Sequence, residues 1–373
     1  MSLAVIARNL AESSATAPER LKYLKDGNKI ALYGAGAMGR DVLRALTEWG
    51  VAVWCFLDRN AMPGQTVEGY PVLRPDDDVI LQHRAAAHLI VCIFNPTTDL
   101  GSLYRKLMSD GWHSVTSAVQ LYQLFPGLRP QLALDSAECY VGKADEILSV
   151  QDLWSDEKSR RFYEALVEFR VTGDYGLLDP PDSLQYFPSD VPPWKTPLRL
   201  IDCGAYDGDT LRVLWQLKLP VEAVMAFEPD PVNYSALIAQ RDAGQFDYME
   251  ISLWPCGVYS RAAQLRFSAG LGVGSRISEE GTEVTQCVAL DDCVGRFRPT
   301  LVKMDIEGGE YDALMGAVRT IKEYRPGLTV CLYHRPDDLW RIPALIRSWD
   351  LGYKFYLRGH ACNGYELILY AIQ

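Results

Sequence analysis

Acidic side chains crowd a glycine-containing loop in the segment LIDCGAYDGDT, residues 200–210. Asp202, Asp207 and Asp209 follow an apolar run and are interleaved with two glycines. A strand, glycine turn and helix in this order usually present backbone N–H groups and a positive helix end to a pyrophosphate. Three carboxylates would repel that anion. The loop instead favours a ligand that carries a sulfonium and an ammonium group, such as S-adenosylmethionine.

Glu228 follows at the position where the ribose of such a ligand needs an acceptor. It ends the next apolar run, AFEPD, twenty residues after Gly208. A carboxylate at the end of the second strand accepts hydrogen bonds from ribose hydroxyls. The alternative is that Gly204 and Gly208 only form a tight turn and that Asp209 only caps a helix. The order of loop and acid favours cofactor binding.

Two groups of polar residues follow later apolar runs. KMDIEGGE contains Asp305, Glu307 and Glu310, and LYHRPDDL contains His334. Open α/β sheets bind ligands at the carboxyl ends of their strands, so both groups are expected beside the cofactor. His334 is the preferred general base for a hydroxyl acceptor, because the ordinary pKa of imidazole is about 6.5. The alternative is that His334 only holds its loop through a backbone hydrogen bond.

Asp305 and Glu307 have a second interpretation, as ligands of a divalent ion such as Mg²⁺ that would activate the hydroxyl. Two carboxylates hold Mg²⁺ only together with water and substrate, so this alternative is not favoured. The predicted catalytic residues are therefore His334, Asp305 and Glu307.

A different glycine loop, GAGAMGR, lies near the beginning of the chain. Gly34, Gly36 and Gly39 follow an apolar run, and Asp58 ends the next one. The loop has no carboxylate, so it could bind a phosphate, with Asp58 on a ribose. NAD is one candidate. FLDRN and GYPVLRP resemble small nucleotide-sugar-type domains, and a domain without ligand that serves docking or dimerisation is the third alternative.

These loops require two sheets to position them. Apolar runs alternate with helical patterns around both loops, which indicates doubly wound, mostly parallel α/β sheets. The last two runs, YKFYLRG and YELILYAIQ, lack a crossover helix and should form an antiparallel pair at one sheet edge. We predict a Rossmann-like domain over residues 1–125, a helical and Pro-rich connector over 126–197, and the main α/β domain over 198–373.

Composition narrows the possible partners. The 373 residues carry a net charge of −11, and the basic residues form no stripe, which argues against nucleic-acid binding. The first twenty residues contain charges and no uncharged run long enough for a signal peptide or membrane span, so a cytoplasmic protein without membrane contact is expected. The nine cysteines include no CxxC pair and are expected to be reduced.

The C-terminal half resembles the FkbM family of methyltransferases. The loop at 202–210, the FEP at 227–229 and the K-x-D-x-E-G-x-E pattern at 303–310 match its motifs, and the likeness covers roughly residues 135–373. The resemblance implies a class I methyltransferase fold, S-adenosylmethionine as cofactor, and usually O-methylation of a natural product or carbohydrate. Cys256 stands where many relatives have an Asn near the adenine. The expected cofactor-binding residues are Asp202, Gly204, Ala205, Asp207, Gly208, Thr210, Glu228, Pro229 and Cys256.

The predicted function is therefore S-adenosylmethionine-dependent methylation of a hydroxyl on a small molecule or carbohydrate, in a possible homodimer. One alternative is a non-catalytic nucleotide or nucleotide-sugar binding protein or scaffold that retains the fold. An NAD-dependent oxidoreductase is the least favoured, because residues 1–125 contain no recognisable catalytic set.

Overall fold

The computed structural model describes residues 24, 27–124, 137–268, 276, 277, 281 and 283–373. The chain forms two compact units, and it passes between them more than once. Unit 1 comprises Met1–Asp152, Glu157–Asp182 and Gly359–Glu366, and unit 2 comprises Leu153–Asp156, Ser183–Arg358 and Leu367–Gln373. The predicted connector, 126–197, is thus distributed between the units; its residues 126–136 lie outside the described part.

Unit 1 contains a six-stranded sheet with the order β3-β4-β2-β1-β5-β6. All neighbouring pairs are parallel except β3 and β4. This mostly parallel sheet does not conflict with the predicted Rossmann-like domain. The strands are β1 (Lys29–Tyr33), β2 (Cys55–Leu57), β3 (Thr66–Val67), β4 (Tyr70–Leu73), β5 (Ala87–Val91) and β6 (Ser114–Ser117). The helices are α3 (Ala37–Glu48), α4 (Asp78–His83), η1 (Arg84–Ala86), α5 (Leu100–Ser109) and α6 (Ala118–Leu124).

The helical segment predicted before Tyr175 belongs mainly to unit 1. The long helix α9 (Glu157–Thr172) is followed by η3 (Tyr175–Leu177), and the hydroxyl of Ser117 donates to the carbonyl of Gly173 between them (2.6 Å). This buried bond joins the helix end to strand β6. The remaining elements of the segment are α7 (Ala137–Gly142), α8 (Ala144–Ser149) and η2 (Gln151–Leu153). The described residues 178–197 form neither helix nor strand, as their prolines predict.

Unit 2 contains a seven-stranded sheet with the order β16-β17-β15-β14-β7-β8-β9. The pairs from β15 to β9 are parallel, whereas β17 runs antiparallel to β15. Its strands are β7 (Leu198–Cys203), β8 (Val221–Phe227), β9 (Glu250–Trp254), β14 (Leu301–Met304), β15 (Gly327–Cys331), β16 (Lys354–Gly359) and β17 (Leu367–Ile372). The doubly wound sheet with the last two strands at one edge is thereby confirmed.

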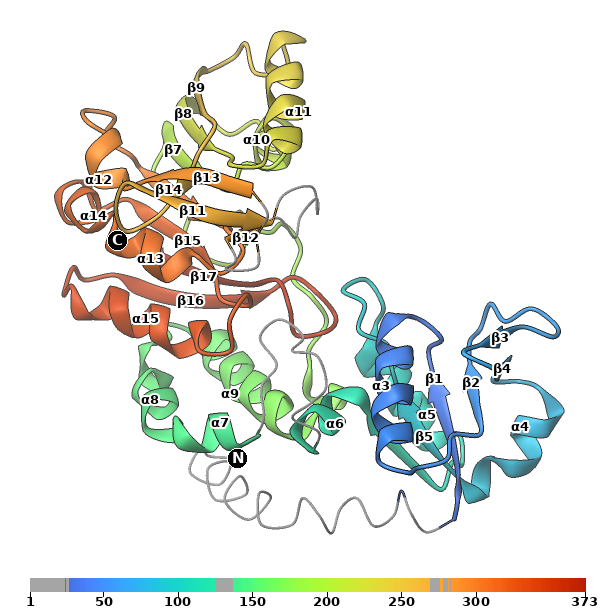
Figure 1. Cartoon of the computed structure of the whole chain (residues 1–373). Helices are drawn as coiled ribbons and strands as arrows, with labels where there is room; N and C mark the ends of the chain where they lie inside the picture. The colour runs from blue at the N-terminus through green and yellow to red at the C-terminus, as the bar shows by residue number, and fades with distance from the viewer. Residues whose placement is uncertain (1–23, 25–26, 125–136, 269–275, 278–280, 282) are drawn as a thin grey trace. The chain divides into compact units, whose positions relative to one another are not determined.

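Helices follow the central strands of unit 2, as Figure 1 shows. The carboxyl ends of β7, β8, β14 and β15 consequently meet at one edge of the sheet, where the loops to these helices begin. The helices are α10 (Asp209–Gln216), α11 (Pro231–Asp242), α12 (Leu290–Cys293), α13 (Glu310–Met315), α14 (Val318–Tyr324) and α15 (Asp338–Ser348).

A second, four-stranded sheet in unit 2 was not expected from the sequence. Its order is β10-β13-β11-β12, and most of its pairs are antiparallel. Its strands are short and alternate apolar with polar residues, so they lack the continuous apolar runs that mark the main sheet. They are β10 (Gly257–Val258), β11 (Ala263–Ser268), β12 (Arg276–Ile277) and β13 (Glu283–Val288).

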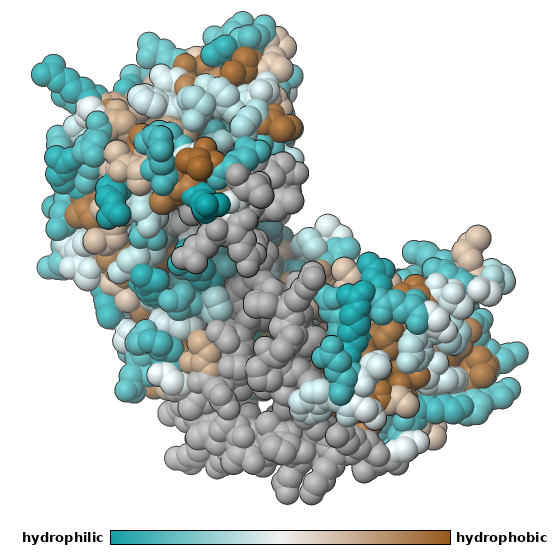
Figure 2. Space-filling view, viewed as in Figure 1, coloured by the Kyte–Doolittle hydropathy of each residue, from teal (hydrophilic) through white to brown (hydrophobic). Residues whose placement is uncertain are grey.

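The outer surface is mainly polar on the face that Figure 2 shows, where hydrophobic side chains lie scattered among hydrophilic ones. Scattered apolar residues are normal on protein surfaces. Among the residues that the structure describes, no helix is both long enough and apolar enough to pass through a membrane.

Candidate active site

The glycine loop of unit 2 connects β7 to α10 and touches the end of β14. Gly204 has a φ of +81°, and a β-carbon added there would lie 1.9 Å from the carbonyl oxygen of Asp305. Gly208 has a φ of +88° and faces the ring of Phe246, 2.9 Å from where a β-carbon would lie. Backbone conformation and close packing therefore require glycine at both positions, as the simpler interpretation of a tight turn also expects. Asp209 is the first residue of α10.

Glu228, at the end of β8, fastens this loop to the next one. Its carboxylate accepts hydrogen bonds from the backbone N–H of Tyr206 (2.8 Å) and of Asp230 (2.9 Å). The side-chain amide of Asn233 donates a third, longer bond (3.5 Å). Burial raises the pKa of Glu228, while these donors oppose the rise. The carboxylate is thus held in a fixed orientation beside the loop.

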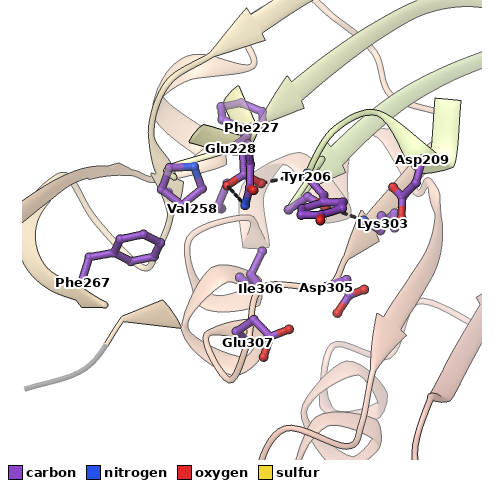
Figure 3. Close-up of a pocket in the computed structure, with 14 residues that line it drawn as sticks. Tyr206, Asp209, Phe227, Glu228, Val258, Phe267, Lys303, Asp305, Ile306 and Glu307 are labelled. Atoms are coloured by element: carbon purple, nitrogen blue, oxygen red, sulfur yellow. Dashed lines mark hydrogen bonds between the residues drawn. The ribbon is translucent and has the colours of Figure 1, made fainter. Parts of the chain in front are cut away.

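A pocket lies between these loops at the carboxyl ends of the strands (Figure 3). The space within it, part of which is open to solvent, amounts to about 750 Å³. In Figure 3, Asp305 and Glu307 lie together below Phe227 and Glu228, with Phe267 to one side and Asp209 to the other. The pocket is lined by Gly204, Tyr206, Asp209, Phe227, Glu228, Pro229, Asn233, Gly257, Val258, Phe267, Lys303, Asp305, Ile306 and Glu307.

Five residues that the sequence predicted are in this lining: Gly204, Glu228, Pro229, Asp305 and Glu307. The other predicted cofactor residues lie around the pocket without lining it. They are Asp202, Ala205, Asp207, Gly208, Thr210 and Cys256.

Asp202 serves the interior of the sheet rather than the pocket wall. Its carboxylate pairs with the ammonium group of Lys303 at 3.0 Å, and the side chains are 0% and 3% exposed. Lys303 also donates to the carbonyl of Gly204 (2.6 Å). Burial raises the pKa of Asp202 to about 6, with Lys303 opposing the rise. Burial alone would lower the pKa of Lys303, but Asp202, Asp305 and Asp209 outweigh it and raise the pKa.

Three other predicted residues are either paired or buried beside the pocket. Asp207 forms an ion pair with Arg212 on α10 (2.8 Å). Thr210 is buried in the first turn of the same helix. Cys256 is also buried, and burial raises the pKa of its thiol to about 11. Asp207 and Thr210 thus lie at the start of α10, and Cys256 directly precedes β10 of the small sheet.

The opposite side of the pocket includes Asp305 and Glu307. These two residues belong to the acidic cluster, which we define as Asp305, Glu307, Glu310 and His334. Nδ1 of His334 lies 2.8 Å from Oε1 of Glu310, and Nε2 lies 3.5 Å from Asp305 Oδ1 and 3.6 Å from Glu307 Oε1. Glu310 also accepts from the backbone N–H groups of Ile306 (2.8 Å) and Gly308 (3.1 Å). Glu310 thereby fixes both the loop after β14 and the imidazole.

Burial and neighbouring charges shift the pKa values of two members of the cluster, His334 and Asp305. Burial by itself would lower the pKa of His334, but Glu310, Glu307 and Asp305 together raise it well above its ordinary value. Burial acts on Asp305 in the opposite direction, and Lys303, His334 and the hydroxyl of Tyr186 (2.7 Å) lower its pKa overall. The three carboxylates therefore favour positive charge at this position. The roles of His334, Asp305 and Glu307 in catalysis stay predictions.

Two residues of the lining have an unusual backbone. Tyr206 and Glu307 have φ values of +48° and +57°. Residues other than glycine adopt this left-handed region at a cost of roughly 1–2 kcal/mol. Such conformations concentrate at functional sites, where the surrounding structure holds them.

The N-terminal loop also borders a pocket, within unit 1. Gly34, Gly36 and Asp58 are among its lining residues. Gly39 is outside the lining, and a β-carbon there would lie 2.1 Å from the carbonyl of Gly34. Asp58 accepts from the backbone N–H of Asn60 (2.9 Å). A nucleotide at this site stays a prediction.

The main sheet of unit 2 identifies the fold class. The seven-stranded sheet with an antiparallel strand beside β15 is a class I methyltransferase fold, as predicted. The crystal structure of methyltransferase FkbM from Methylobacillus flagellatus KT is similar to the chain, with a TM-score of 0.75 and 20% identity over 98% of this chain and 100% of that one.

A family model matches part of unit 2. Residues 202–355 match the model of the methyltransferase FkbM domain, so this part of the chain is an FkbM methyltransferase domain and the resemblance is confirmed. A structure of the citrinin polyketide synthase CMeT domain reaches a TM-score of only 0.26 at 11% identity, over 100% of this chain and 97% of that one. None of the curated proteins matches the chain significantly.

Several pocket residues lay outside the sequence prediction. Val258 and Phe267 belong to the small sheet, which the sequence did not predict, and neither is part of a recognisable motif. Lys303 and Ile306, in contrast, are part of the motif at 303–310, where an alternating strand places Lys303 and Asp305 on the same face. That period of two was a signal that the sequence contained.

Proposed function

We propose that the protein transfers the methyl group of S-adenosylmethionine to a hydroxyl of a small molecule or carbohydrate. The observation that carries this proposal is the orientation of Glu228, whose carboxylate is fixed by two backbone N–H groups and lines the pocket. A carboxylate offers about four acceptor positions, two on each oxygen. Oε1 of Glu228 accepts from Asp230 and Asn233 and Oε2 accepts from Tyr206 alone, so Oε2 retains capacity for a ribose hydroxyl.

The chemistry of the remaining lining fits the same cofactor. Gly257, Val258 and Phe267 offer an apolar surface of the kind that an adenine ring contacts. Asp209, at the other side, offers a carboxylate to an ammonium group, and Gly204 allows close approach to the loop backbone. When bound, S-adenosylmethionine supplies an electrophilic methyl group on a sulfonium.

The acidic cluster would receive the acceptor. Asp305 and Glu307 line the pocket, so a hydroxyl can donate a hydrogen bond to either carboxylate. Positioning the oxygen and receiving its proton are the main tasks of the protein in such a transfer. The acceptor class rests on the family resemblance and on the polarity of this side of the pocket.

The test is a calorimetric titration of the full chain with S-adenosylhomocysteine. Glu228→Gln keeps the size of the side chain but removes its charge, so the dissociation constant should rise by about 10- to 100-fold, as expected for hydrogen bonds to a charged group worth roughly 1.5–3 kcal/mol. Glu250→Gln is the control, because Glu250 is exposed at the start of β9. Equal affinity in wild type and Glu228→Gln would refute the assignment. A non-catalytic binding protein would bind the cofactor but methylate none of a panel of hydroxylated acceptors.

A further inference from the structure

The imidazole of His334 has a buried nitrogen directed at two carboxylates. Its side chain is 1% exposed, and Nε2 has no hydrogen-bond partner among the described residues. The distances from Nε2 to Asp305 Oδ1 (3.5 Å) and Glu307 Oε1 (3.6 Å) exceed the ordinary range of about 2.7–3.2 Å for hydrogen bonds. A buried polar atom of this kind requires a partner.

We propose that Asp305, Glu307 and His334 bind a divalent transition-metal ion through one atom each. Their three ligand atoms all lie within 4.8 Å of one another. Nitrogen and oxygen ligands sit about 2.0–2.2 Å from such an ion. At angles of roughly 90–110°, two of these ligands are about 3.0–3.6 Å apart, which is the separation seen on both sides of Nε2. The three ligand atoms would have to move closer together around the ion to close the site.

The surroundings orient these ligands as outer residues of metal sites do. Glu310 holds Nδ1 of the imidazole at 2.8 Å, which leaves Nε2 free to direct its lone pair to an ion when Nδ1 carries the proton. The hydroxyls of Tyr186 (2.7 Å) and Tyr333 (3.3 Å) donate to the two oxygens of Asp305. Each ligand except Glu307 is therefore held by a second protein group.

The charges and donor types indicate the class of ion. Three carboxylates surround one imidazole, and a dication would offset most of this negative charge. An imidazole nitrogen beside two carboxylate oxygens suits Mn²⁺, Fe²⁺ or Zn²⁺ better than Mg²⁺ or Ca²⁺, which prefer oxygen ligands only.

The position of the site gives it a role that rests on the proposed methyl transfer. Asp305 and Glu307 line the pocket, so the remaining coordination positions of the ion face the acceptor side. A hydroxyl bound there would have a lower pKa, and its proton would pass to the carboxylate oxygen of Glu307 that does not bind the ion. His334 would then act as a ligand in place of the general base that the sequence suggested.

The experiment titrates the full chain, freed of metal by a chelator and without cofactor, with Mn²⁺. Binding is followed by calorimetry and by electron paramagnetic resonance. We expect one ion per chain, with a nitrogen coupling from His334 in the pulsed spectrum that disappears in His334→Gln. Glu307→Gln should raise the dissociation constant at least about 10-fold. Glu250→Gln should change it less than twofold.

Folding of each variant is checked by circular dichroism, and Asp305→Asn replaces Glu307→Gln if the latter does not fold. Absence of Mn²⁺ binding at millimolar concentration, equal affinity in Glu307→Gln, or a bound ion without nitrogen coupling would each overturn the proposal. A titration with S-adenosylhomocysteine in the presence of chelator separates the two proposals: cofactor binding with no Mn²⁺ binding refutes the metal site alone. Mn²⁺ binding without cofactor binding refutes the cofactor assignment alone.

Discussion

Gly204→Ala tests the contact that joins the cofactor loop to the acidic cluster. Gly204 has a φ of +81°, and its added β-carbon would lie 1.9 Å from the carbonyl oxygen of Asp305. Gly352, also in unit 2, has a φ of +77° but no atom within 4 Å of the added β-carbon. Gly352→Ala therefore shares the conformational cost and lacks the collision.

The magnitude follows from these two terms. The left-handed conformation costs an alanine roughly 1–2 kcal/mol, and this term is common to both variants. The collision in Gly204→Ala requires the backbones of β7 and β14 to separate at their ends, where the N–H of Asp305 donates to the carbonyl of Cys203 (3.1 Å). Overpacking of this kind costs about 1–3 kcal/mol more. The free energy of unfolding should fall by about 2–5 kcal/mol in Gly204→Ala, against about 1–2 kcal/mol in Gly352→Ala.

Urea unfolding followed by tryptophan fluorescence and circular dichroism gives both values from the midpoints and slopes. Titration of each folded variant with S-adenosylhomocysteine and Mn²⁺ adds a functional measure. A displaced Asp305 should lower the affinity for Mn²⁺ more than the substitution at Gly352 does. If the two variants lose the same free energy, the close approach of the loop to Asp305 is wrong.

Two further predictions concern burial in both units. Asp202→Asn should lower the free energy of unfolding by about 3–5 kcal/mol, because it leaves the ammonium group of Lys303 buried without its pair. The exposed pair of Glu222 with Arg199 is the control, and Glu222→Gln should cost at most about 1 kcal/mol by urea unfolding; similar losses would contradict the buried pair. A thiol reagent should modify at most three cysteines of the native chain rapidly, Cys139, Cys293 and Cys362, and all nine after denaturation, since the other six are buried. Rapid modification of more than three would show that the interior is more open than described.

The main sheets could be predicted from sequence because their strands are continuous apolar runs. The run before Asp202 and the one before Glu228 are buried on both sides of the sheet, so hydrophobicity alone marks them. The small sheet could not be predicted in this way. Its strand β13, EVTQCV, has one face toward solvent and few residues, and its neighbours are distant in sequence.

The sequence could predict only those site residues whose place follows from their position at the end of a strand. Glu228, Asp305 and Glu307 follow strand ends, and the structure places them in one pocket. The interior position of Asp202 depends on its pairing with Lys303, which is about one hundred residues away in the chain. The carboxylates around His334 likewise come from another strand end, so their effect on its pKa is invisible in the local sequence.

Because the chain passes between the units repeatedly, unit 1 cannot finish folding before unit 2 is made. Residues Gly359–Glu366 belong to unit 1, although the strands on either side of them belong to unit 2. Within unit 1, the N–H of Cys362 donates to the carbonyl of Pro96 (2.9 Å), and the ring of Tyr365 packs on Phe94 at 4.7 Å. Domains normally mature in order as the ribosome delivers them, the N-terminal one first. Here the first unit to be translated must wait for residues 359–366, which are made after most of unit 2, so unit 1 is completed only when unit 2 is largely synthesised.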